Sequence, residues 1–134
     1  MTVEPFEIVR EVPLTQDETF ARLTDWPRHG DVMPFTDVRV TETGIVVHTG
    51  IGRVGFDDPM DIVQWDPPRF CRLEKRGRVL RGWADICVWP TDTGSKVVWR
   101  EVAHVTGVPR IMARVEKAAG TVLFGRLLNG LTRT

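Results

Sequence analysis

Between residues 35 and 105 the chain alternates short β-prone segments with tight turns, and this succession limits the possible folds most strongly. Turn signals recur at Glu42-Thr-Gly44, Asp66-Pro-Pro68, around Gly77, and at Pro90-Thr-Asp-Thr-Gly94. Strands joined by such short connections pair antiparallel, because a parallel pair needs a crossover of a dozen or more residues. The expected strands of this meander span residues 35–41, 45–56, 60–65, 69–75, 82–89 and 96–105.

Helical signals lie only at the two ends of this meander. A strand over 3–12 precedes a capping box, in which Thr15 and Glu18 satisfy each other's backbone amides, so a helix starts there and ends at 25–27. Residues 26–35 then form at most a short second helical turn. After the last strand, Pro109 suits the first turn of a long helix with a broad apolar stripe. Two glycines, at 120 and 125, are expected to weaken or kink that helix.

The segment HTGIGRVGF, residues 48–56, contains the spacing G-x-G-x-x-G of a dinucleotide-binding loop. That loop binds a pyrophosphate only where a strand runs into it and a helix leaves it. Here Phe56-Asp-Asp-Pro59 and another strand follow, so no helix N-terminus is available. We therefore expect no nucleotide cofactor, and we interpret the three glycines as residues that bend or bulge one long strand over 45–56.

Three segments resemble the START-like superfamily (SRPBCC proteins), in its polyketide cyclase/dehydrase and lipid-transport branch. They are LTDWPRHGDVMPFTDVRVTETG (23–44), VQWDPPRFCRLEKRG (63–77) and GSKVVWREV (94–102). The resemblance implies an α+β helix-grip fold for residues 1–134 as a single domain. In that fold a curved seven-stranded antiparallel sheet wraps around a long C-terminal helix, with one or two short helices after the first strand. The superfamily includes carriers, receptors and enzymes, so the fold alone does not decide the chemistry.

The resemblance also implies a cavity between the sheet and the helix that starts near Pro109, with its mouth near residues 26–35. A curved sheet around one helix leaves a concave side that is not completely filled, and such gaps become apolar pockets. The residues expected to line this cavity are Trp26, Met33, Phe35, Trp99, Glu101, Met112, Val115 and Ala119. The facing of the strands over 45–56 and 82–89 stays open at this stage.

Glu101 is the one candidate catalytic residue. In the last strand, the cations Lys96 and Arg100 share one phase, so Trp99 and Glu101 share the other and point inward. An inward carboxyl group has a raised pKa and can act as a base. The alternative is a structural role, in which Glu101 pairs with an arginine on a neighbouring strand. We expect the two cysteines, Cys71 and Cys87, to be inert thiols that face each other across one hairpin.

Composition excludes several classes of function. Eighteen basic and eighteen acidic side chains cancel, so no overall field favours nucleic acid or an anionic membrane. The three histidines lie in separate segments without metal-ligand spacing, so no metal is expected. The sequence shows no secretory signal and no apolar run of membrane-spanning length, which predicts a cytoplasmic monomer or homodimer without membrane insertion.

Three functions remain. The first is binding of a small hydrophobic molecule such as a lipid, quinone or polyketide. The second is an enzyme of the cyclase, aromatase or dehydratase type that needs neither metal nor nucleotide. The third is an interaction module whose cavity is packed shut. An open apolar pocket favours the first, inward charged groups at an open pocket favour the second, and a filled cavity favours the third.

Overall fold

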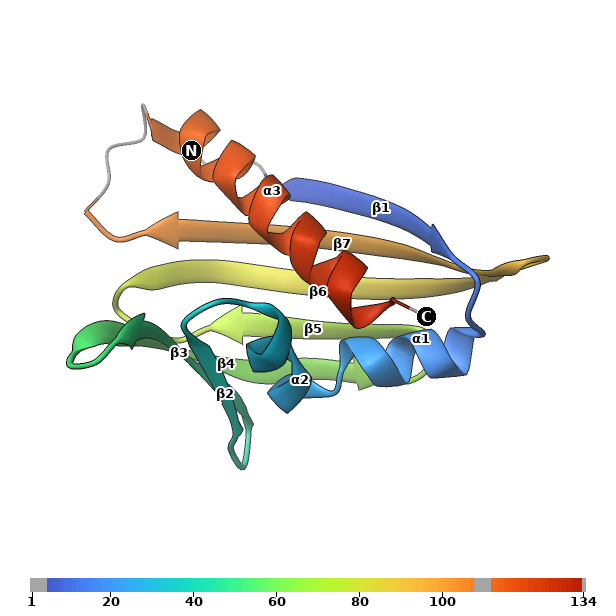
Figure 1. The fold of residues 1–134 in the computed structure, drawn as a ribbon, viewed down its shortest axis with the longest axis horizontal. Coiled ribbons are helices and arrows are strands. Elements are labelled where there is room, and N and C mark those ends of the chain that lie inside the picture. The colour runs from blue at the N-terminus through green and yellow to red at the C-terminus, as the bar shows by residue number, and fades with distance from the viewer. Residues whose placement is uncertain (1–4, 108–111, 134) are drawn as a thin grey trace.

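The computed structural model describes residues 5–107 and 112–133. It contains seven strands in one antiparallel sheet and three helices (Figure 1). The strands follow the spatial order β1-β7-β6-β5-β4-β3-β2, so each strand after β1 pairs with its neighbour in the chain and β1 closes against β7. The described elements, in chain order, are β1 (Phe6–Val12), α1 (Gln16–Leu23), α2 (Trp26–Val32), β2 (Thr36–Val40), β3 (Gly44–Ile51), β4 (Val54–Asp66), β5 (Phe70–Lys75), β6 (Leu80–Thr91), β7 (Gly94–Val105) and α3 (Ala113–Leu131).

Helix α1 begins at the predicted cap. Thr15 accepts a hydrogen bond from the amide of Glu18, and Asp17 and Glu18 place negative charge in the first turn, where it favours the helix dipole. The buried hydroxyl of Thr19 lies 2.7 Å from that of Ser95 and ties α1 to β7. Residues 26–32 form a second short helix, α2, that packs against β2 and α3.

The long helix α3 crosses the concave face of the sheet obliquely and contacts β1 and β7 (Figure 1). Its C-terminal half carries the tight packing, because Leu127, Leu128 and Leu131 are fully buried. The helix is continuous across both of its predicted weak points, Gly120 and Gly125. At Gly120 a Cβ atom would lie 2.6 Å from the Phe6 ring, so the missing side chain lets this aromatic approach the helix. The predicted helix start near Pro109 lies outside the described residues.

The glycine-rich segment is a hairpin and not one bent strand. Strand β3 ends at Ile51, which pairs with Val54, so Gly52 and Arg53 alone form the turn. Gly52 has φ of 60°, a conformation that tight hairpin turns require and that glycine adopts without steric cost. Gly50 and Gly55 face each other across the two strands. The predicted single strand over 45–56 was wrong, because one glycine marks the hairpin turn and the other two flank it.

The cysteine register also differs from the prediction. Cys71 pairs with Ile86, and Cys87 pairs with Phe70, so the two thiols are offset by one residue and belong to opposite faces of the sheet. Cys71 is completely buried, and burial raises the pKa of its thiol to about 12. A thiol with such a pKa stays protonated and unreactive at neutral pH.

Candidate functional site

A cavity of about 420 Å³ lies between α3 and the concave face of the sheet. This volume falls within the range of about 300–1,000 Å³ that is typical of small-molecule sites. Most of its wall is apolar and comes from every element except β1 and α1. The cavity reaches the surface along α3, where Leu123 lines it and is still 41% exposed. Representative apolar lining residues are Met33, Ile45, Val47, Ile86, Trp99 and Phe124.

Contacts at two places along α3 fix its position over the cavity. The Glu116 carboxylate accepts hydrogen bonds from the His104 ring at 3.0 Å and from the Val105 amide at 2.8 Å, which ties the start of α3 to the end of β7. Further along, the Phe124 ring packs on Phe6 and Trp99 at centroid distances of 5.7 and 5.8 Å. The helix is thus fixed at both ends of the cavity without filling it.

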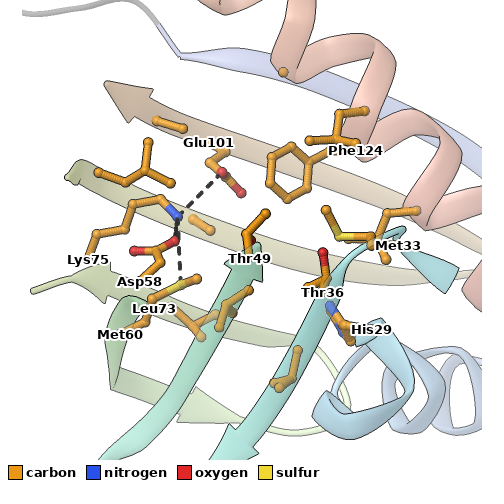
Figure 2. Close-up of a pocket in the computed structure, with 18 of the residues that line it drawn as sticks. His29, Met33, Thr36, Thr49, Asp58, Met60, Leu73, Lys75, Glu101 and Phe124 are labelled. Atoms are coloured by element: carbon orange, nitrogen blue, oxygen red, sulfur yellow. Dashed lines mark hydrogen bonds and ion pairs between the residues drawn. The ribbon is translucent and has the colours of Figure 1, made fainter. Parts of the chain in front are cut away.

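One wall of the cavity holds a buried charged cluster of Asp58, Lys75 and Glu101, from β4, β5 and β7 (Figure 2). The Lys75 ammonium donates to Asp58 Oδ2 at 2.9 Å and lies 3.8 Å from Glu101 Oε2. The Trp99 indole N–H donates to Glu101 Oε1 at 3.1 Å. All three charged side chains are less than a tenth exposed. We call these three residues the Asp58–Lys75–Glu101 cluster.

Strand geometry explains why the cluster can form. Leu73 pairs with Ala84, and Ala84 pairs with Glu101, so a small side chain separates β5 from β7 on this face. Lys75 lies two residues after Leu73 and therefore on the same face of β5. Its long side chain reaches Glu101 across the small side chain of Ala84 on β6. Figure 2 shows the resulting ion pair between Lys75 and Glu101.

Burial and mutual attraction set the protonation of the cluster. Burial raises the pKa of Glu101, although the Lys75 charge and the Trp99 hydrogen bond oppose this rise. Burial likewise raises the pKa of Asp58 against the attraction of Lys75. For Lys75, burial acts to lower the pKa, but the two carboxylates together outweigh it and the pKa is raised. Lys75 is therefore held as a cation between two acids that keep their protons more readily than in water.

His29 lies on the cavity wall beside two tryptophans. Its ring is buried, lies 5.3 Å from the Trp26 ring and 6.3 Å from the Trp99 ring, and places Nε2 2.7 Å from the Leu23 carbonyl. A carbonyl only accepts, so Nε2 carries the proton and Nδ1 is the unprotonated nitrogen of the neutral ring. Burial lowers the pKa of His29, and the Leu23 carbonyl opposes this only partly.

This lowered pKa predicts a pH effect on stability. Because the unfolded chain binds a proton at His29 more readily than the folded protein, the contribution of the neutral ring is complete above about pH 6.5 and is lost as pH falls through the folded pKa. In His29→Phe, this part of the pH dependence should disappear. Urea unfolding of both proteins between about pH 5 and 7 measures it. Equal slopes of unfolding free energy against pH in the two proteins would contradict a neutral buried ring.

Several solved structures share the fold of this chain over nearly its whole length. The chain superposes on the protein XoxI from Bacillus cereus with a TM-score of 0.74 at 14% identity, over 97% of this chain and 94% of that one. It superposes on the di-domain ARO/CYC protein StfQ of the steffimycin biosynthetic pathway with a TM-score of 0.76 at 11% identity, over 96% of this chain and 49% of the other. The Polyketide_cyc-like protein Cgl2372 from Corynebacterium glutamicum matches with a TM-score of 0.64 at 11% identity, over 96% of this chain and 89% of that one.

The chain has the helix-grip fold. The resemblance to START-like SRPBCC proteins that the sequence showed is thereby confirmed at the level of the fold. No protein-family model matches the sequence, and no curated protein is significantly similar to it. At these identities the structural likeness shows the fold, and the function must be argued from the site.

Five of the eight residues predicted to line the helix-grip cavity lie on its wall. They are Trp26, Met33, Trp99, Glu101 and Ala119. The predicted alternation in β7 agrees with the structure, since Val97, Trp99 and Glu101 are buried whereas Lys96 and Arg100 are exposed. In the two ranges whose facing was open, the side chains on the cavity wall are Ile45, Val47, Thr49, Phe56, Ala84 and Ile86.

The other three predicted lining residues lie elsewhere. Phe35 is 66% exposed and has φ of 56°, so the backbone turn that leads into β2 directs it to solvent. Met112, at the helix N-cap, and Val115 are 41% and 57% exposed. The residues of α3 that line the cavity are instead Glu116, Ala119, Gly120, Leu123, Phe124 and Leu127. Helical spacing alone did not show which edge of the broad apolar stripe faces the sheet.

Sequence reasoning missed Asp58, Lys75 and His29. Asp58 fell between the predicted strands over 45–56 and 60–65, whereas the structure places it inside β4. Lys75 had a detectable signal, since Cys71 and Leu73 share its phase in a strand and a cation on an apolar phase is unusual. For Glu101, the predicted structural partner was an arginine, whereas the observed cation is Lys75.

Within the described ranges, no group of three or more histidine, cysteine, aspartate or glutamate side chains is arranged to hold a metal ion. In the same part of the chain, no helix is long and apolar enough to cross a membrane.

Proposed function

We propose that the protein binds a small, mainly apolar molecule in the cavity between α3 and the sheet. The observation that carries this proposal is the cavity itself, which has a volume of about 420 Å³ and an apolar wall that includes two tryptophans, Trp26 and Trp99. Protein interiors are close-packed, so an unfilled space of this size in a small protein is exceptional. The unfilled cavity also argues against an interaction module whose core is packed shut.

The enzymatic alternative uses the same cavity. The Asp58–Lys75–Glu101 cluster supplies groups that hold or move a proton beside a bound molecule, so one observation favours a cyclase- or dehydratase-type reaction as the second candidate. Both functions require that an apolar molecule enters the cavity, and binding is therefore the first property to test.

Binding is measurable with N-phenyl-1-naphthylamine, a neutral apolar dye that absorbs tryptophan emission. The chain has five tryptophans and no tyrosine, and two of the five line the cavity. We expect saturable quenching of tryptophan emission together with enhanced dye emission, at roughly micromolar affinity, or about −8 kcal/mol. Trp99→Phe should reduce the energy transfer while the protein stays folded, because the smaller ring leaves only a small void.

The control for this experiment is Trp89→Phe. Trp89 is 48% exposed near the end of β6 and does not line the cavity, so its loss should leave the dye affinity unchanged. Dye emission that rises linearly without saturation, or that is equally insensitive to both substitutions, would contradict binding at this site.

A further inference from the structure

We propose that the ligand carries a hydrogen-bond donor, a hydroxyl or ammonium group on an apolar body, and that the Glu101 carboxylate accepts it. This inference rests on the proposed function, because it names the class of molecule that the same cavity takes. The apolar wall selects for the body of the ligand. The polar part of the wall must then select for its head group, and the contacts of that part favour donors.

The cavity wall has hydrogen-bond acceptor capacity that the protein leaves unused. A carboxylate has two oxygens with about four lone-pair sites. Within the described part of the chain, Glu101 Oε1 accepts a hydrogen bond from Trp99, whereas Glu101 Oε2 faces the Lys75 ammonium at an ion-pair distance of 3.8 Å, too long for a hydrogen bond. Asp58 Oδ1 likewise has no hydrogen-bond partner there. Glu101 is 2% exposed, and its carboxylate points into the space between Lys75 and Phe124 (Figure 2). Buried polar atoms are nearly always hydrogen-bonded. A donor group on the ligand would therefore supply the hydrogen bond that Glu101 Oε2 lacks.

The hydrogen-bond donors next to Glu101 on the wall are already engaged. The Trp99 N–H is used by Glu101, and the His29 Nε2–H is used by the Leu23 carbonyl. Lys75 donates to Asp58 Oδ2 and points a further N–H at Met60 Sδ, 3.8 Å away. The Thr36 hydroxyl donates to the Pro34 carbonyl. A ligand that only accepts hydrogen bonds from these groups would have to displace one of these contacts. The Thr49 hydroxyl also lines the cavity (Figure 2), and because it can both donate and accept it favours neither class of ligand.

The charge of the cluster disfavours an anionic ligand. The cluster contains two carboxyl groups and one ammonium, so an anionic head would add a third acid to a site that already has more acids than bases. Negative charges that lie close together repel each other strongly in a buried site that excludes water. The other titratable side chains on the wall do not reverse this balance, since His29 is held neutral and the Glu116 carboxylate already pairs with His104. A hydroxyl or an ammonium head adds no negative charge.

The test is a series of four linear probes with unbranched apolar chains of nine or ten carbons that differ in the head: decan-1-ol, decylamine, decanoate and methyl decyl ether. At neutral pH the amine is a cation and the acid an anion, whereas the ether is neutral and can only accept. Each probe competes with N-phenyl-1-naphthylamine on the unmodified protein. We expect the alcohol and the amine to bind about tenfold to a hundredfold more tightly than the ether, since hydrogen bonds to charged groups are among the strongest.

Decanoate should bind the most weakly of the four. Ether or decanoate binding as tightly as the alcohol would overturn the inference and leave the proposed apolar site intact. Failure of all four probes to displace the dye would instead count against the proposed function. The relative affinities of the alcohol and the amine identify the kind of donor. Tighter binding of the amine indicates a cationic head group, and tighter binding of the alcohol indicates a neutral one. Either order supports a donor.

The variant Glu101→Gln tests whether Glu101 causes the preference for probes that donate a hydrogen bond. Glu101→Gln keeps the size of the side chain and an oxygen for Trp99, but it turns an acceptor into an amide donor. The preference of alcohol over ether should therefore fall to about threefold or less. The matched control is Asp57→Asn, on the strand position next to Asp58, where the carboxylate is exposed and pairs with His48. This control should leave the preference unchanged, and an unchanged preference in Glu101→Gln would refute the role of Glu101.

Discussion

Replacing Lys75 by methionine is expected to lower the free energy of unfolding by about 3–5 kcal/mol at neutral pH. Methionine retains much of the apolar stem but removes the ammonium that lies 2.9 Å from Asp58 and 3.8 Å from Glu101. Two buried carboxyl groups would then share one wall without a cation. Denaturant unfolding, followed by tryptophan emission, measures the loss.

The loss of unfolding free energy in Lys75→Met should depend on pH. The raised pKa values of Glu101 and Asp58 give the direction of this dependence. Between the unfolded and the folded pKa of Glu101 and Asp58, the folded protein binds more protons, so stability falls as pH rises through this window. The Lys75 charge opposes both shifts, and removing it extends the window to higher pH. Lys75→Met should therefore be less destabilising at about pH 5 than at about pH 8.

Two further variants separate the charge effect from a packing effect. Lys96→Met removes an exposed lysine from β7 and should change stability by less than about 0.5 kcal/mol. The triple variant Asp58→Val, Lys75→Met, Glu101→Met removes all three charges together and should recover most of the loss, because a buried ionic group replaced by apolar residues is often neutral or stabilising. A triple variant as unstable as Lys75→Met would mean that packing, and not charge, explains the effect.

The second large effect concerns ligand access. Ala103 lies on the cavity wall in β7, two residues beyond Glu101, with the side-chain-free Gly82 opposite it on β6. In Ala103→Phe the ring would extend into space that the native protein leaves empty. We expect the dye affinity to fall about a hundredfold or more, equivalent to about 2.7 kcal/mol, because the ring and the ligand compete for one volume. The protein should remain folded, since filling a cavity removes a void and displaces no packed side chain.

Val98→Phe is the matched control for this variant. Val98 is half-buried in the same strand but on the opposite phase, and it does not line the cavity. The same increase in size there should leave the dye affinity within about twofold. If Ala103→Phe binds the dye as the native protein does, while its unfolding stays cooperative, the ligand occupies another site.

Much of the architecture was predictable because local signals specify it. The Thr15 cap, the turn residues and the alternation of β7 each act within a few residues, and their order matches one fold. The resemblance added the curvature and the cavity. Local signals failed at the segment 48–56, where glycine can mark either a bend in a strand or the turn of a hairpin, and only the pairing of Ile51 with Val54 distinguishes them.

By itself, the sequence determined the antiparallel meander, the helix that closes it, and the inward phase of Trp99 and Glu101, because turn chemistry and period-two patterning act locally. Only the tertiary structure decided that Lys75 meets both Asp58 and Glu101, since the three residues come from three strands. Lys75 reaches Glu101 across the small side chain of Ala84 on the strand between them. The tertiary structure also decided which edge of α3 faces the cavity. Contacts between residues far apart in the chain depend on strand register and helix position, which the sequence pattern does not encode within any one segment.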